Sequence, residues 1–147
     1  MKNSNYEKQI SELILETICK FDERDSKERN FGTDVNIHHS EIHMIKFIKE
    51  NTDLHISAIA RKLGITRGAV SQTIKRLQSK GLITKEVDEG NNSKIVVRLT
   101  GKGQTAYINH ENYHKQYEIR IKNILENMGA GSEKVVYDFL LEFYRKI

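Results

Sequence analysis

The sequence predicts a mainly α fold with one small β-hairpin. Several stretches repeat apolar residues every three or four positions, which is the spacing of one helix face. Two β-rich runs are separated by turn-forming residues, which predicts a hairpin. Residues 56–81 have the pattern of two short helices joined by a tight glycine turn. The 147 residues contain no proline, an absence that helices tolerate better than loop-rich folds do.

Length and composition bound the class of protein. A chain of 147 residues is one domain by length, and 30% charged and 37% apolar residues are ordinary for a soluble, helix-rich protein. No window approaches the ~18 apolar residues of a membrane-spanning helix, and the N-terminus has no apolar export segment. The single cysteine, Cys19, excludes an internal disulfide. We therefore expect a cytoplasmic protein with no membrane partner.

Positive charge is concentrated in the middle of the chain. Residues 57–102 carry ten Lys and Arg against three acids, a net charge of +7, whereas the whole chain is +4. A basic middle between acidic ends is typical of a module that binds a polyanion. A solvated basic surface has the same composition, so charge alone leaves both interpretations open.

The N-terminal third predicts two helices. The first has apolar residues at helical spacing from Ile10 to Phe21. The polar segment 21–36 interrupts that period and predicts a connection. A second helix follows over residues 39–50, where isoleucines restore the spacing.

Residues 56–81, ISAIARKLGITRGAVSQTIKRLQSKG, predict a helix-turn-helix. Ser57 is placed to cap the first helix, and Gly64 supplies the left-handed turn that ends it. Thr66 is a good N-cap for the second helix, because its hydroxyl can accept an early backbone N–H. The apolar inner face of that second helix consists of Val70, Ile74 and Leu77.

The outer face of the second helix carries side chains suited to the major groove of DNA. Arginine bonds guanine edges, glutamine pairs with adenine, and serine serves either. A purely structural helix pair would not need these residues within a region of such charge. We therefore predict binding to double-stranded DNA. The residues predicted to read bases or contact adjacent phosphates are Thr66, Arg67, Ser71, Gln72, Lys75 and Arg76.

The hairpin after the helix-turn-helix is predicted to be a wing. The runs LITKEV and SKIVVRLT flank DEGNN, in which Gly90, Asn91 and Asn92 are turn formers. The tip of a wing reaches the adjacent minor groove or backbone. Lys94 and Arg98 are available there for phosphates, so both are predicted DNA contacts.

Two further helices are predicted after the wing. Thr100 is a plausible N-cap for a long helix over 103–127, and a strong apolar stripe marks a last helix that ends at Ile147. The first and last helices have little core of their own, which predicts packing against each other and against a second copy. We expect dimerisation helices in 1–36 and 101–147, with a DNA-binding lobe in 37–100.

The order of these elements resembles the MarR family of winged-helix repressors over nearly the whole chain. The most specific pieces are ISAIARKLGITRGAVSQTIKRLQSKGLITK and VVRLTGKG, the latter similar to the L-T-x-x-G that opens the family's long dimerisation helix. The resemblance implies a homodimeric transcriptional regulator, a repressor on a palindromic operator, whose effector alters the spacing of its two DNA-reading lobes. The family's usual Asp-x-Arg pair near the wing tip is replaced by Asn91 and Ser93, with Lys94 beside them.

The segment from His110 to His114 is a literal H-E-x-x-H. In a zinc protease that pattern supplies two metal ligands and the general base. Such an enzyme also needs a third ligand and a substrate cleft, whereas the 33 residues after His114 predict a dimerisation segment. A zinc hydrolase is therefore a remote alternative, and we expect no enzyme. Two solvated histidines on a long helix are the plainer interpretation of the spacing alone.

One branch of the MarR family, the zinc-sensing adhesin competence repressors, is similar in its histidines. Its regulatory zinc is held by two His at the start of the long helix, a His from the second helix and an acid from the loop before it. The resemblance implies these roles for His110, His114, His43 and Asp25, with Glu23 and Glu28 as alternatives to Asp25. That branch builds a second site with a Cys, and Phe31 occupies the matching place here.

Other branches of the family leave other effectors open. Some respond to organic or phenolic ligands, and the aromatic residues Tyr107, Tyr113, Tyr117 and Phe139 are candidates to line such a pocket or to belong to the core. Another branch responds to thiol oxidation, for which Cys19 is the candidate, although we expect a half-buried structural thiol.

Overall fold

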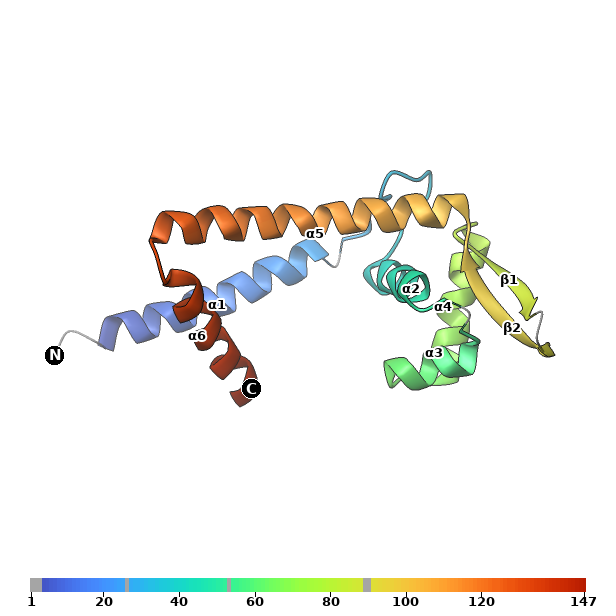
Figure 1. The fold of residues 1–147 in the computed structure, drawn as a ribbon, viewed down its shortest axis with the longest axis horizontal. Helices are drawn as coiled ribbons and strands as arrows, with labels where there is room; N and C mark the ends of the chain where they lie inside the picture. The colour runs from blue at the N-terminus through green and yellow to red at the C-terminus, as the bar shows by residue number, and fades with distance from the viewer. Residues whose placement is uncertain (1–3, 26, 53, 89–90) are drawn as a thin grey trace. The chain divides into compact units, whose positions relative to one another are not determined.

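The structure is a computed structural model that describes residues 4–25, 27–52, 54–88 and 91–147 (Figure 1). It divides into two compact units, of which the first ends at Asn109 and the second begins at His110. In chain order the elements are α1 (Ser4–Asp25), α2 (His39–Glu50), α3 (Ile56–Leu63), α4 (Arg67–Ser79), β1 (Ile83–Asp88), β2 (Asn91–Leu99), α5 (Gly101–Met128) and α6 (Ser132–Lys146).

The predicted helix-turn-helix is confirmed as α3 and α4. Gly64 ends α3 with φ +65°, a left-handed conformation that glycine adopts without steric cost. Thr66 caps α4, and its Oγ1 accepts the Ala69 N–H at 3.1 Å. The prediction of Ser57 as the cap of α3 is wrong. The N-cap position is held by His55, and Ser57 lies inside the first turn.

The wing is an antiparallel pair of strands in which Ile83 lies opposite Leu99 and Val87 opposite Ile95. A bulge follows Val87, where the pairing shifts. The hairpin prediction is therefore confirmed, but Asn91 and Asn92, predicted as turn formers, already belong to β2. Gly90 lies outside the described residues.

One hydrophobic core joins α2, α3, α4, the wing and the start of α5. Among the described residues, the largest fully buried apolar side chains are those of Ile37, Ile45, Ile59, Val70, Ile74, Leu77, Leu82 and Ile83. The predicted inner face of α4 is therefore its buried face. Burying such side chains is the dominant favourable term in folding, so the outer face of α4 is held on a packed body.

The segment before α2 was predicted to begin at residue 21, but α1 continues to Asp25. The following loop is tied back on itself by a bridge between Arg29 and Ile37. It is also tied to α5, because the Asn109 side chain donates to the Phe31 carbonyl at 3.1 Å and Lys102 Nζ lies 2.7 Å from Asp34 Oδ1. The loop is thus an ordered part of the first unit.

The second unit consists of the rest of α5 and all of α6. No residue of α6 is buried, and Leu140, Tyr144 and Ile147 are 52%, 75% and 85% exposed. Apolar surface of this extent is typical of interaction sites. Among the described residues, the structure contains no helix of the length and apolarity needed to cross a membrane.

Candidate nucleic-acid interface and metal ligands

The outer face of α4 carries the predicted base-reading side chains. Arg67, Gln72 and Lys75 are exposed, and Ser71 is half-buried. They lie away from the core because buried residues of α4 recur at three- and four-residue spacing, which leaves the opposite face to solvent. The result is a row of hydrogen-bonding groups on a rigid helix.

The hydroxyl of Thr66 caps the N-terminus of α4. Its oxygen accepts the Ala69 N–H, which satisfies one of the backbone donors that every helix start leaves open. The hydroxyl proton stays available for a phosphate oxygen. The N-terminus of α4, with its partial positive charge, is suited to the same anion.

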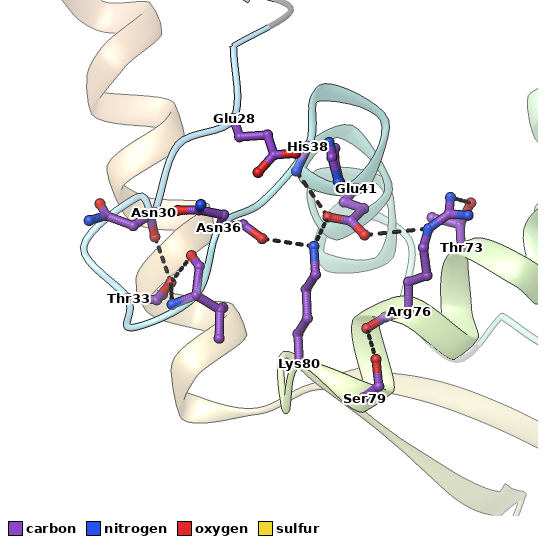
Figure 2. Close-up of polar contacts among 11 residues, drawn as sticks. Glu28, Asn30, Thr33, Asn36, His38, Glu41, Thr73, Arg76, Ser79 and Lys80 are labelled. Atoms are coloured by element: carbon purple, nitrogen blue, oxygen red, sulfur yellow. Dashed lines mark hydrogen bonds and ion pairs between the residues drawn. The ribbon is translucent and has the colours of Figure 1, made fainter.

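Arg76 lies differently from the other predicted DNA contacts. Its Nε is 3.4 Å from Glu41 Oε1, and its Nη2 donates to Thr73 Oγ1 at 3.2 Å (Figure 2). The side chain is half exposed, yet its guanidinium interacts with an acid of α2. Helical spacing alone does not tell which of Arg76 and Lys75 has a partner within the protein. The two positions are adjacent at the edge of a helix face, and they differ only in which side chains of the neighbouring helix lie within reach.

Of the two DNA contacts predicted in the wing, Arg98 and Lys94, the structure describes the side chain of Arg98 alone. Arg98 Nε donates to Glu86 Oε2 at 2.8 Å across the strands, and about half of each side chain is exposed. Exposed pairs of this kind contribute little stability, so Arg98 can exchange its partner at low cost. The side chain of Lys94 lies outside the described residues.

Glu41 is the polar residue that the sequence interpretation missed. Its side chain is fully buried, and Oε2 accepts the His38 N–H at 2.9 Å and the Lys80 ammonium at 2.6 Å. Burial alone raises the pKa of Glu41, but the Lys80 hydrogen bond and charge and the His38 N–H outweigh burial and hold it below 4.5. The available signal was a glutamate three residues after His38, the residue that precedes the predicted helix, which is half of a capping box.

His110 and His114 come together as their spacing predicted. They share one face of α5, and their Nε2 atoms lie 3.0 Å apart. Nitrogens bound to one tetrahedral zinc lie about 3.3 Å apart, so the pair is close to the arrangement of two ligands. His110 is only 3% exposed, and its Nδ1 lies 3.5 Å from Glu111 Oε1. The donors present therefore fit zinc.

The other implied ligands belong to the first unit. His43 is exposed on α2, with its ring 4.2 Å from that of His39. The side chain of Asp25 lies outside the described residues, and Glu28 Oε1, an alternative acid, lies 3.1 Å from His38 Nδ1. Within the described part of the chain, no group of three or more metal-ligating side chains is assembled.

The candidates for other effectors are dispersed. Tyr113 and Tyr117 contact each other through their hydroxyls at 2.8 Å. Phe139 stacks on Phe143, and Tyr107 packs against the core of the first unit. Cys19 is exposed, so the expectation of a half-buried thiol is wrong.

Comparisons with known proteins place these features in a class. Residues 35–91 match the MarR family. The HTH-type transcriptional regulator PchR of Bacillus subtilis (strain 168) is 26% identical over 69% of this chain and 60% of its own length. The uncharacterized HTH-type transcriptional regulator YhjH of the same organism is 24% identical over 71% of this chain and 62% of its own length. The chain thus spans about three fifths of the curated relatives it matches.

Solved structures share the fold over nearly the whole chain. Wild-type Lactococcus lactis ZitR aligns with a TM-score of 0.75 and 21% identity, over 98% of this chain and 99% of that one. The zinc-dependent MarR family regulator AdcR in its Zn(II)-bound state aligns with a TM-score of 0.74 and 20% identity, over 97% of each chain. Streptococcus pneumoniae FabT in complex with DNA aligns with a TM-score of 0.62 and 25% identity, over 95% of this chain and 91% of that one.

The fold, a mainly helical chain with a two-stranded wing, is that of the MarR winged-helix proteins. Residues 35–91 are thus similar to the MarR family, and a larger part of the chain is similar to curated HTH-type transcriptional regulators.

Proposed function

We propose that this protein is a sequence-specific DNA-binding transcriptional regulator that acts as a homodimeric repressor on a palindromic operator. The observation that carries the proposal is the outer face of α4, where Arg67, Gln72 and Lys75 are exposed on a capped helix followed by a wing. The match to the MarR family and the likeness to a protein solved in complex with DNA support it.

The homodimer is supported by apolar surface in each unit. In α1, Leu13, Leu15 and Ile18 are 61%, 60% and 53% exposed. In the second unit, α6 has no buried residue. A second copy that covers these faces also supplies the two-fold symmetry that places two recognition helices about one DNA turn apart.

The DNA-reading roles are separable by substitution. Gln72→Ala is expected to cost specificity at one base pair in each half-site, because an amide pairs with a particular base edge. Lys75→Ala is expected to weaken binding to all sequences similarly, because a phosphate contact carries no sequence information. Affinities on a panel of operator variants measure both effects. An equal loss on every sequence for Gln72→Ala contradicts its base-reading role.

Zinc is the proposed effector, and His110 and His114 are its proposed ligands. The proposal is supported by their Nε2 separation of 3.0 Å. His43 and Asp25 join the set on the strength of the family resemblance. A zinc ion held by all four supplies a cross-link between the segments that carry them. Its effect on DNA affinity is limited to its difference in affinity for the competent and incompetent forms.

The test is fluorescence anisotropy of the purified apo-protein on labelled DNA from upstream of its own gene, with zinc titrated and chelator added afterwards. We expect a change in affinity that chelator reverses, that disappears in His110→Ala and His114→Ala, and that persists in Asn112→Ala. Asn112 is a matched control because it is exposed on the same helix. DNA affinity that does not change with zinc contradicts zinc as the effector. The remaining candidate effectors are then organic ligands and oxidation of Cys19. Absence of DNA binding rejects the regulator itself.

A non-enzymatic role is part of the proposal. The curated relatives described above are regulators, and the Glu111 carboxylate lies against the ring nitrogen of His110. Glu111→Gln is expected to leave the DNA response largely intact, whereas it abolishes hydrolysis in an H-E-x-x-H enzyme. Peptide hydrolysis by the wild type that is lost in this variant contradicts the non-enzymatic role.

A further inference from the structure

We propose that Glu41 is a positioning residue for operator recognition. Its buried carboxylate holds two cations at the C-terminal end of α4, and so removes them from the set that contacts DNA phosphates. This inference rests on the proposed function and assigns a role to a residue far from the base-reading face.

The position of Glu41 begins the argument. It is the third residue of α2, and its Oε2 accepts the backbone N–H of His38, the residue before the helix. The Glu41 side chain is fully buried. A buried carboxylate is costly unless charges and hydrogen bonds compensate it.

The compensation comes from α4. Lys80, the C-cap of that helix, places its Nζ 2.6 Å from Glu41 Oε2 and 2.7 Å from the Asn36 carbonyl oxygen (Figure 2). Arg76, one turn earlier, places its Nε 3.4 Å from Glu41 Oε1. One carboxylate therefore binds both cations of the last turn and connects α4 to the start of α2 and to the loop.

The C-terminal end of α4 is also in contact with α5. Lys102 Nζ donates to the backbone carbonyl of Lys80 at 3.2 Å and also lies 2.7 Å from Asp34 Oδ1. The C-cap of α4 is thus held by its side chain from one direction and by its carbonyl from the other. These contacts determine the direction in which α4 presents its outer face.

The cations of α4 consequently fall into two groups. Arg67 and Lys75 are exposed on the outer face and are free to approach a duplex. The Lys80 side chain is 24% exposed, and both Lys80 and Arg76 form ion pairs with the single carboxylate of Glu41. Electrostatic attraction to DNA is independent of sequence, so withholding two cations limits non-specific binding while the orientation of α4 serves specific binding.

The experiment counts phosphate contacts through salt dependence. Each neutralised phosphate steepens the plot of log affinity against log salt by about 0.9. Affinity is measured between low and moderate salt on a duplex that the wild type enriches from a random-sequence pool, and on a scrambled duplex of the same composition. The variants are Glu41→Gln and Arg76→Gln, with Lys75→Gln as the matched phosphate-contact control.

The expected results separate the two groups. Lys75→Gln lowers the salt slope by about one per protomer on both duplexes. Arg76→Gln leaves the slope unchanged. Glu41→Gln, which keeps the shape of the side chain and removes its charge, steepens the slope by about 0.9 for each of the two released cations that reaches a phosphate. It also lowers the ratio of specific to scrambled affinity by roughly tenfold, as expected for a residue coupled to the site through packed contacts.

Three outcomes are decisive. An Arg76→Gln slope that falls as much as that of Lys75→Gln overturns the proposal, because Arg76 is then a phosphate contact. A Glu41→Gln protein with the wild-type slope and specificity ratio also overturns it. If circular dichroism shows that Glu41→Gln does not fold, the salt slope of Arg76→Gln still tests the proposal, because Arg76 is half exposed. A wild type that enriches no duplex rejects the proposed function instead.

Discussion

Gly103→Ala gives the most direct test of how the wing joins α5. A Cβ at Gly103 lies 2.0 Å from the Leu82 carbonyl oxygen and 3.4 Å from Leu99 Cβ. Ordinary contacts exceed that first distance by more than about 1 Å, so the backbone must move. The same Leu82 oxygen accepts the Thr100 N–H at 3.1 Å. Overpacking costs about 1–3 kcal/mol and a lost hydrogen bond about 1 kcal/mol, so we expect a loss of about 2–4 kcal/mol.

Gly101→Ala is the matched control. Gly101 begins the same helix, and a Cβ there meets nothing within 4 Å. Removing glycine from the unfolded chain at a compatible position stabilises by about 0.4–1 kcal/mol. The unfolded-state effect is common to both variants, so their difference isolates the clash.

Urea unfolding followed by circular dichroism measures that difference. Protein concentration is held constant because the stability of a dimer depends on it. We expect Gly103→Ala to lower the midpoint while the slope with urea stays the same. Stabilities of the two variants within about 0.5 kcal/mol of each other refute the clash argument.

Two further predictions follow from the contacts of the first unit. Thr66→Ala removes the acceptor for the Ala69 N–H and is expected to lower the free energy of unfolding by about 1 kcal/mol. Thr66→Asn keeps a side-chain acceptor and is expected to restore most of that loss. Equal stability of the wild type and Thr66→Ala in urea contradicts the role of Thr66 as a cap. The pKa of Glu41 is lowered from 4.5 in the folded state, so its stabilisation is complete above 4.5 and is lost as pH falls through the lower folded value. The free energy of unfolding, measured in urea, is therefore expected to fall less steeply from pH 7 to pH 3 for Glu41→Gln than for the wild type. Parallel profiles for the two proteins refute this prediction.

The helix-turn-helix was predictable because its signals are local. Gly64 and Thr66 act through the backbone conformation and hydroxyl of single residues, and both behave as predicted. Val70, Ile74 and Leu77 share a face through the period of the helix alone, and all three are fully buried. The same locality brings His110 to His114, since one helix turn separates them.

Errors and omissions occurred where a residue's role depends on a distant segment. Ser57 was preferred as a cap by residue type, although the actual start of α3 is set by the chain entering from the bridge between His55 and Val96. Glu41 was given no role from the sequence, because the cations that make its burial tolerable come from α4. Arg76 and Lys75 are neighbours of similar charge, and only the position of Glu41 separates them.

By itself the sequence determined the helix-turn-helix, the wing, the order of the helices and the charged outer face of α4. These features follow from backbone conformation, side-chain period and residue chemistry over short spans. The tertiary structure decided which cations of α4 face solvent, how its C-terminal end is anchored and where Glu41 lies. Those outcomes depend on which groups from separate helices meet out of water, where the strength of a charge interaction is set by its surroundings and not by spacing along the chain.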